Sequence, residues 1–250
     1  MSDSPKRKMA LQLIGSNIAR HGHHVYVVSN GPIPRFAYTI GVRNSTGAEL
    51  VLGGSIIYHY DEVIQIINDI ASKLRRGLTP ASKFECDMKG AFTLGAVHPS
   101  WASKLFLGAF DYFETKEVAA LQILPDQDHW TIDIPDMSQP WSAASAPAWT
   151  WLYESWTSPV PNSSVATTNF AALRGGRITQ VARWEADQWE AFAGSPPETE
   201  DEARVVPIGT LIGADESLSR MTRLSVGEGI WRDEESNWQP WGSSGEAEKA

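Results

Sequence analysis

The chain has 250 residues, of which 42% are hydrophobic and 20% are charged, and its formal net charge is −9. This length accommodates one large domain or two of ordinary size, and the hydrophobic content excludes global disorder. An acidic surface repels nucleic-acid phosphates and anionic lipids, so we expect neither nucleic acid nor a membrane as a partner. The same charge favours a protein partner with a basic surface.

Cysteine usage points to a reducing compartment. The single cysteine, Cys86, excludes an intrachain disulfide. Its acidic neighbours Glu85 and Asp87 oppose thiolate formation, so we expect an unreactive thiol. The N-terminus lacks the apolar core and cleavage site of a signal peptide, and no run approaches the roughly 18 apolar residues of a membrane span. We therefore expect a cytoplasmic protein.

The residue pattern of the first half of the chain predicts helices and short strands that alternate irregularly. Apolar residues at helical spacing predict an amphipathic helix over residues 5–20 and a stronger one from Asp61 to Arg76. Ser100 is expected to cap a helix that runs to about Phe113. Runs of β-branched and aromatic residues predict strands over residues 25–28, 36–42, 49–53, 91–97 and 118–124.

The predicted strand over residues 36–42 has two unlike faces. Tyr38 lies on one face, whereas Ala37, Thr39 and Gly41 share the other, which is small and slightly polar. Either a ligand approaches this small face or a helix packs against it. Gly41 marks a bulge or a close approach of another backbone segment.

Four short motifs occur in a distinctive order: His21-Gly22-His23-His24-Val25, Phe36-Ala37-Tyr38-Thr39-Ile40-Gly41, Glu49-Leu50-Val51 and Leu121-Gln122-Ile123-Leu124-Pro125-Asp126. Over about residues 15–141 this order resembles a bacterial domain family of unknown function, number four-two-six-two. The family usually has Pro before the Glu-Leu pair and Trp before the Pro-Asp pair, where this chain has Ala48 and Leu124. The resemblance implies a fold, and no established activity comes with it. The 36–41 run is also similar to flavin-reductase-type split barrels, which would imply a flavin.

A Trp-rich connector over residues 142–164 follows the first module, which we place at residues 1–141. Ser, Ala and Pro dominate it, yet it carries far more aromatic residues than a flexible linker. On a helix, Trp149, Tyr153 and Trp156 share a face. We expect that face to dock the two halves together, and the alternative is an exposed contact site for a partner.

The second module is placed at residues 165–241. It predicts a hairpin from residues 177–184 and 188–192, a strand at 205–208, and a helical turn after a capping Asp215. The tail over residues 242–250 is expected to be disordered. The predicted fold class is α+β, with two small modules that each contain a mainly antiparallel or mixed sheet packed with helices.

The second module also resembles, loosely, small bacterial immunity proteins. The resemblance rests on the run Asp187–Gly194, an acidic loop, the strand Arg204–Ile208 and the closing pair Trp231-Arg232. It implies protein binding with no chemistry of its own.

Two constellations suggest chemistry. His21, His23 and His24 are the densest set of metal-ligand candidates, but no third ligand at a fixed spacing supports them, so we expect helix-end and surface histidines and no metal. Asp126 and Asp128, with His129 close by, suggest acid–base catalysis at a strand end, and Tyr38, Glu49 and Trp101 would line the same cleft. No phosphate loop, nucleophile elbow or zinc-protease motif is present, and we expect no cofactor.

The sequence therefore predicts a non-catalytic protein-binding factor, an immunity or antitoxin-like protein that neutralises a partner protein. The alternative is an enzyme or small-molecule-binding protein that uses the N-terminal cleft, with Tyr38, Glu49, Asp126 and His129 as its catalytic candidates. The predicted binding residues are Tyr38, Thr39, Trp101, Trp130, Trp149, Trp151, Trp156 and Trp189.

Overall fold

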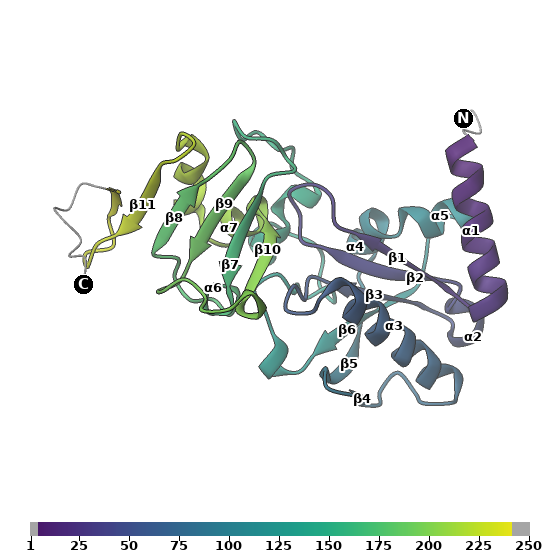
Figure 1. The fold of residues 1–250 in the computed structure, drawn as a ribbon. Coiled ribbons are helices and arrows are strands. Elements are labelled where there is room, and N and C mark those ends of the chain that lie inside the picture. Colours follow the sequence, from purple (N-terminus) through teal and green to yellow (C-terminus); the bar gives the residue numbers. More distant parts are fainter. Residues whose placement is uncertain (1–4, 242–250) are drawn as a thin grey trace. The chain divides into compact units, whose positions relative to one another are not determined.

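The computed structural model describes residues 5–241, which form two compact units (Figure 1). Each unit contains a six-stranded sheet with helices packed on it. The predicted α+β class with two modules is therefore confirmed. The predicted disordered tail over residues 242–250 lies outside the described residues. The first unit takes in the chain up to Ser29, Arg35–Trp130 and Ile134–Ser145, and the second takes in Asn30–Pro34, Thr131–Asp133 and the chain from Ala146 onward.

The first unit is built on a sheet with strand order β1-β2-β3-β6-β5-β4. β3 and β6 are parallel neighbours, and the other neighbouring pairs of this sheet are antiparallel. The sheet is open at β1 and β4, so the similarity to split barrels was misleading. The strands are β1 (His24–Val28), β2 (Phe36–Ile40), β3 (Glu49–Gly53), β4 (Phe84–Cys86), β5 (Gly90–Ala96) and β6 (Ala120–Pro125).

Helices cover this sheet. They agree with the predicted helices except at two points. The helix expected to run from Ser100 to Phe113 is broken at Phe106, whose ring packs against Tyr38 with the centroids 5.0 Å apart. Its N-cap is His98, whose Nδ1 accepts from the Ser100 amide at 3.2 Å, so the prediction that Ser100 caps it is wrong. The helices are α1 (Pro5–His21), α2 (Arg43–Thr46), α3 (Tyr60–Arg75), α4 (Pro99–Leu105), α5 (Leu107–Phe113) and the 3₁₀ turn η1 (Gln127–His129).

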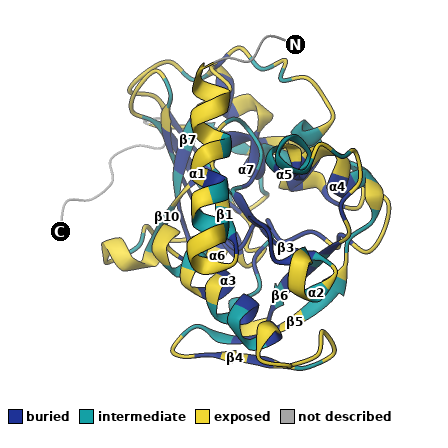
Figure 2. Ribbon diagram, turned by 90° about the vertical axis from the view of Figure 1, so that its right-hand side faces the viewer, coloured by how far each residue is buried: buried dark blue, intermediate teal, exposed yellow. Residues whose placement is uncertain are grey.

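The small face of β2 is covered by α3. Ala37 belongs to one buried cluster with Ile66, Ile67 and Ile70 of that helix, and all four are 0% exposed. Of the two interpretations of the small face, helix packing is therefore right. All five residues of β2 are buried, and Figure 2 shows β3 buried and α1 exposed along most of its length.

Gly41 lets α1 approach the end of β2. Its φ of +113° is a conformation that residues with a Cβ rarely adopt. A Cβ there would also lie 3.0 Å from the Ile18 side chain and 3.2 Å from the Gly22 carbonyl oxygen. The predicted close backbone approach is confirmed.

The second unit has a sheet of order β10-β7-β9-β8-β11-β12, in which β7 and β9 are parallel. The predicted hairpin is formed by β8 and β9, and Asp215 caps the following 3₁₀ helix by accepting from the Ser217 amide at 3.0 Å, as predicted. The strands are β7 (Val165–Asn169), β8 (Gln180–Arg183), β9 (Gln188–Phe192), β10 (Ala203–Pro207), β11 (Gly229–Arg232) and β12 (Trp238–Pro240). The helices are η2 (Pro147–Leu152), α6 (Phe170–Leu173), η3 (Glu200–Glu202), α7 (Ile208–Ala214) and η4 (Glu216–Arg223).

The Trp-rich connector does not form the predicted α-helix. Its helical part, η2, is a short 3₁₀ segment that begins at Pro147 and ends at Leu152, so Trp149 and Trp156 do not share a helical face. Among residues 5–241, none of the helices combines the length and the apolar character that a membrane-spanning helix needs.

Candidate functional site

The predicted N-terminal cleft is instead part of the core. Tyr38 is 2% exposed, and Thr39 and Glu49 are each 0% exposed. The Tyr38 hydroxyl accepts from the Gly108 amide at 3.0 Å, and burial raises the pKa of Tyr38 to about 12. These side chains stabilise the first unit and are not presented to a ligand.

Glu49 is held by three donors inside the sheet. The Thr39 hydroxyl donates to it at 2.6 Å, and the amides of Gly41 and Val42 donate at 2.7 and 3.1 Å. Burial raises the pKa of Glu49, and these hydrogen bonds oppose that rise. Since all three groups donate to the carboxylate, they fix the link between β2 and β3.

Asp126 and His129 form a separate dyad at the end of β6. His129 Nδ1 lies 2.6 Å from one Asp126 oxygen, and the Ala91 amide donates to the other oxygen at 2.7 Å. The His129 ring stacks on Tyr58 with centroids 5.6 Å apart. Burial opposes ionisation of Asp126, but hydrogen bonds from Ala91 and His129 prevail and lower its pKa. Asp126 and His129 therefore contact each other and are partly exposed to solvent. They do not share a cleft with Tyr38 and Glu49, which are buried.

The clustered histidines are used in structural contacts. His23 is 5% exposed and lies between Asn68 Oδ1 at 2.9 Å and the Arg75 guanidinium at 3.0 Å. His24 Nδ1 pairs with the Asn17 amide at 2.8 Å, and His21 lies in the last turn of α1. Within residues 5–241, no group of three or more His, Cys, Asp or Glu side chains is arranged to hold a metal ion.

Three of the predicted binding tryptophans are core residues, contrary to that prediction. Trp101, Trp149 and Trp189 are 1–2% exposed. Each indole N–H is satisfied by a backbone carbonyl: Trp101 donates to Gln139, Trp149 to Asp133 and Trp189 to Met221. They bury large rings and satisfy their one donor, which is what a core requires. Trp130 is half-buried at the end of η1.

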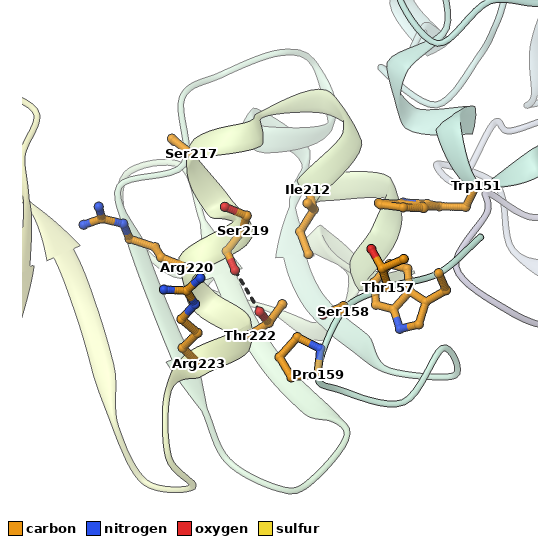
Figure 3. Close-up of a pocket in the computed structure, with 11 residues that line it drawn as sticks. Trp151, Thr157, Ser158, Pro159, Ile212, Ser217, Ser219, Arg220, Thr222 and Arg223 are labelled. Carbon is orange, nitrogen blue, oxygen red and sulfur yellow. Dashed lines mark hydrogen bonds between the residues drawn. The ribbon is translucent and has the colours of Figure 1, made fainter. Parts of the chain in front are cut away.

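The two remaining tryptophans of that set, Trp151 and Trp156, line a groove of about 450 Å³ in the second unit (Figure 3). Their rings meet edge to face, with centroids 4.9 Å apart and planes at 76°. Each is half-buried. The other lining residues are Thr157, Ser158, Pro159, Ile212, Ser217, Ser219, Arg220, Thr222 and Arg223.

Close packing between η2 and α7 positions the aromatic end of the groove. The Trp151 indole donates to the Gly209 carbonyl at 3.2 Å, and a Cβ at Gly209 would collide with the Trp151 ring. A Cβ at Gly213, one turn later, would collide with the Pro147 carbonyl. The Trp156 indole donates to the Val160 carbonyl at 2.8 Å, which fixes the second ring. Both rings are therefore rigid before any ligand arrives.

The opposite wall of the groove is basic. Arg220 and Arg223 lie on η4 and have no hydrogen-bond or ion-pair partner within residues 5–241. The Ser158 hydroxyl oxygen is buried and also lacks a partner within that range. The arrangement offers apolar rings and unpaired positive charge to the same ligand.

Trp151 and Trp156 were predicted from the sequence as binding residues, whereas the two arginines of this groove were not. Arg220 and Arg223 are three residues apart, so they share a helical face, and this spacing was the available signal. Ser158 gives no signal in the sequence, because its burial depends on the fold around it.

Cys86 is buried at the end of β4, and its thiolate is disfavoured for a different reason than predicted. Burial is the largest cause of its raised pKa, about 12, and the hydrogen bond and charge of Asp69 add to it. The adjacent Glu85 and Asp87 are not the cause.

Comparison with known proteins bears on the first unit. No curated protein and no solved structure matched the chain. One family model matched residues 17–130, a range that includes Tyr38, Glu49 and Asp126 and excludes the groove. The resemblance predicted from the four motifs is confirmed for this part: residues 17–130 resemble the family described as Domain of unknown function (DUF4262).

Proposed function

We propose that this chain is a non-catalytic protein-binding factor, acting in the manner of an immunity or antitoxin-like protein through the groove of its second unit. One observation carries the proposal. Two rigid aromatic rings, Trp151 and Trp156, face a wall with two arginines that have no partner among the described residues. Trp and Arg are the side chains most enriched at the energetic centres of protein interfaces.

The chemistry of the groove selects an acidic, extended segment of the partner. Arg220 and Arg223 suit carboxylates, with which a guanidinium forms paired hydrogen bonds. Trp151, Trp156 and Pro159 suit a proline or an aliphatic side chain, since aromatic-lined grooves accept extended Pro-containing segments. The partner's segment would thus alternate apolar and acidic residues.

The net charge of −9 predicts a basic partner, whereas the groove has the opposite local charge. The two expectations concern different surfaces. An acidic loop on an otherwise basic effector satisfies both, because long-range steering depends on net charge and docking depends on local pairs. The proposed setting is the cytoplasm, which the free Cys86 supports.

The test is capture of a partner from the native host by wild-type protein and by the double variant Arg220→Glu, Arg223→Glu. A partner that wild-type protein retains at low salt should be lost by the variant. Arg174→Glu reverses one charge outside the groove and is the control, which should retain the partner. Equal capture by all three proteins would exclude the groove as the binding site.

The alternative, an enzyme or small-ligand site in the first unit, is favoured by the Asp126–His129 dyad. The carboxyl ends of parallel strands, where α/β proteins place ligands, are here the ends of β3 and β6. Ser55, just after β3, has φ +63°, and its buried hydroxyl lacks a partner within residues 5–241. Hydrolysis of p-nitrophenyl acetate that is lost in His129→Gln would support this candidate, and a rate equal to that of free imidazole would exclude it.

A further inference from the structure

A second hollow in the second unit has a different character from the groove. Its volume is about 280 Å³, at the small end of ligand pockets. Its lining is mostly aliphatic, and Leu218 within it is 0% exposed whereas Arg177 is exposed. The arginine therefore lies at the solvent side of an apolar hollow.

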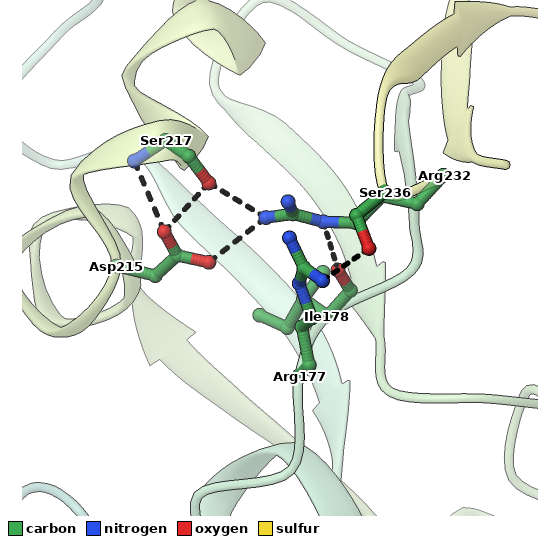
Figure 4. A network of polar contacts seen from close by, with 6 residues as sticks. All are labelled: Arg177, Ile178, Asp215, Ser217, Arg232 and Ser236. Carbon is green, nitrogen blue, oxygen red and sulfur yellow. Dashed lines mark hydrogen bonds and ion pairs between the residues drawn. The ribbon is translucent and has the colours of Figure 1, made fainter. Parts of the chain in front are cut away.

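The one carboxylate in this lining, Asp215, is already neutralised (Figure 4). It pairs with Arg232 at 2.9 Å, and the Arg232 side chain is only 5% exposed. Arg232 also donates to the Ser217 hydroxyl at 2.6 Å and to the Ile178 carbonyl at 2.8 Å. Asp215 in turn accepts from the Ser217 amide and hydroxyl. Both charges of this pair are therefore fully engaged.

Arg177 is left with a net positive charge. Its guanidinium donates a hydrogen bond to the neutral Ser236 hydroxyl, and it has no ion pair within residues 5–241. Figure 4 shows its guanidinium close to that of Arg232. Burial and the charge of Arg177 lower the pKa of Arg232, while Asp215 opposes this. One carboxylate faces two guanidinium groups, so the cluster has an unmet positive charge.

We propose that this hollow binds a small aliphatic monocarboxylate, with its carboxylate on Arg177 and its hydrocarbon body against Ile132 and Ala214, the aliphatic lining residues that are at least partly exposed. The lining decides the class of ligand. A phosphate group would need several further donors, and the aliphatic walls do not supply them. A neutral apolar molecule would leave the arginine charge unused. The site is separate from the groove and does not depend on the function proposed for it.

Hexanoate is the probe, and its binding is measured by calorimetry on the full chain. Acetate retains the charge without the hydrocarbon body, and hexan-1-ol retains the body without the charge. We expect hexanoate to bind at least tenfold more tightly than either. No detectable hexanoate binding at millimolar concentration, or equal binding of acetate, would overturn the proposal.

Two variants test the two halves of the site separately. Arg177→Gln removes the charge and should weaken hexanoate binding severalfold, since the arginine is exposed and screened. Ala214→Phe, at an exposed position of the lining, should fill the hollow and abolish binding while Arg177 remains. Arg174→Gln is the control for net charge and should bind as wild type. Wild-type binding by Arg177→Gln or by Ala214→Phe, with folding checked by circular dichroism, would contradict the proposal.

Discussion

Trp151 and Trp156 meet edge to face at 4.9 Å, and the indole N–H of each is bonded to a backbone carbonyl of the same unit. An edge-to-face pair is a favoured geometry for aromatic rings. Because both donors are satisfied internally, the exposed parts of the rings remain available for apolar contacts. This rigid aromatic end is the part of the groove that needs no rearrangement on binding.

Gly209 is required for the position of Trp151. A Cβ at Gly209 would collide with the indole ring and with the Pro32 carbonyl, so Gly209→Ala should destabilise the protein by about 1–3 kcal/mol through overpacking. Gly15→Ala is the control, because a Cβ there meets Tyr112 at an ordinary 3.7 Å. In the middle of α1 that change should stabilise by about 0.5–1 kcal/mol. Urea unfolding measures both, and equal stability of the two variants would contradict this packing.

Glu49 should be intolerant of neutral replacement. In Glu49→Gln the side-chain NH₂ would face either the Gly41 amide or the Thr39 hydroxyl and the Val42 amide, which are donors to the carboxylate in the native protein. A buried group left unsatisfied costs about 1–3 kcal/mol, so the free energy of unfolding should fall by that amount. Exposed Glu117→Gln should change it by less than about 0.5 kcal/mol. Indistinguishable urea midpoints for the two variants would show that the carboxylate is not needed.

His23 should make the protein less stable in mild acid. Burial lowers the pKa of His23, and Arg75 at 3.0 Å also disfavours its protonated form. The unfolded chain therefore binds a proton near pH 6.5, while the folded chain binds it only at lower pH. Stability is full above about pH 6.5 and falls as the pH drops through the window below that value.

The measurement is urea unfolding at pH 7.5 and pH 5.5 for wild type and His23→Gln. Glutamine can keep both hydrogen bonds and has no charge to gain, so the variant should lose less stability between the two pH values. Equal losses would mean that His23 does not contribute to the acid sensitivity.

Cys86 should resist alkylation in the folded protein. With its pKa raised to about 12 by burial and by Asp69, little thiolate is present at pH 8. Iodoacetamide should therefore label native protein much more slowly than protein in urea. Labelling at the rate of a free thiol, without loss of structure, would disprove this assignment.

Strongly periodic segments were predictable from sequence, and the connector was not. The stripe of Val63, Ile66, Ile67 and Ile70 identified α3, because its apolar residues recur at the helical period. The Trp-rich connector has no such period to fix its conformation. Pro147 begins a 3₁₀ segment there, and tertiary packing against α7 decides the rest.

The candidate site was predictable only in part. A tryptophan gives the same signal in a core as in a binding surface, so Trp149 and Trp151 could not be told apart from sequence. The structure separates them, because Trp149 is 1% exposed and Trp151 lines the groove. Arg220, Arg223 and Ser158 are candidates because their side chains lack hydrogen-bond and ion-pair partners within residues 5–241. Only the folded unit shows this.

The most direct test of the groove follows the indole N–H signals of Trp151 and Trp156 by nuclear magnetic resonance, assigned through Trp151→Phe and Trp156→Phe. The ligand is a short peptide of alternating glutamate and proline, compared with its lysine counterpart. We predict that the glutamate peptide shifts both signals, that the lysine peptide does not, and that Arg220→Gln with Arg223→Gln abolishes the shift. Unchanged signals with the glutamate peptide, or equal shifts with both peptides, would contradict the account.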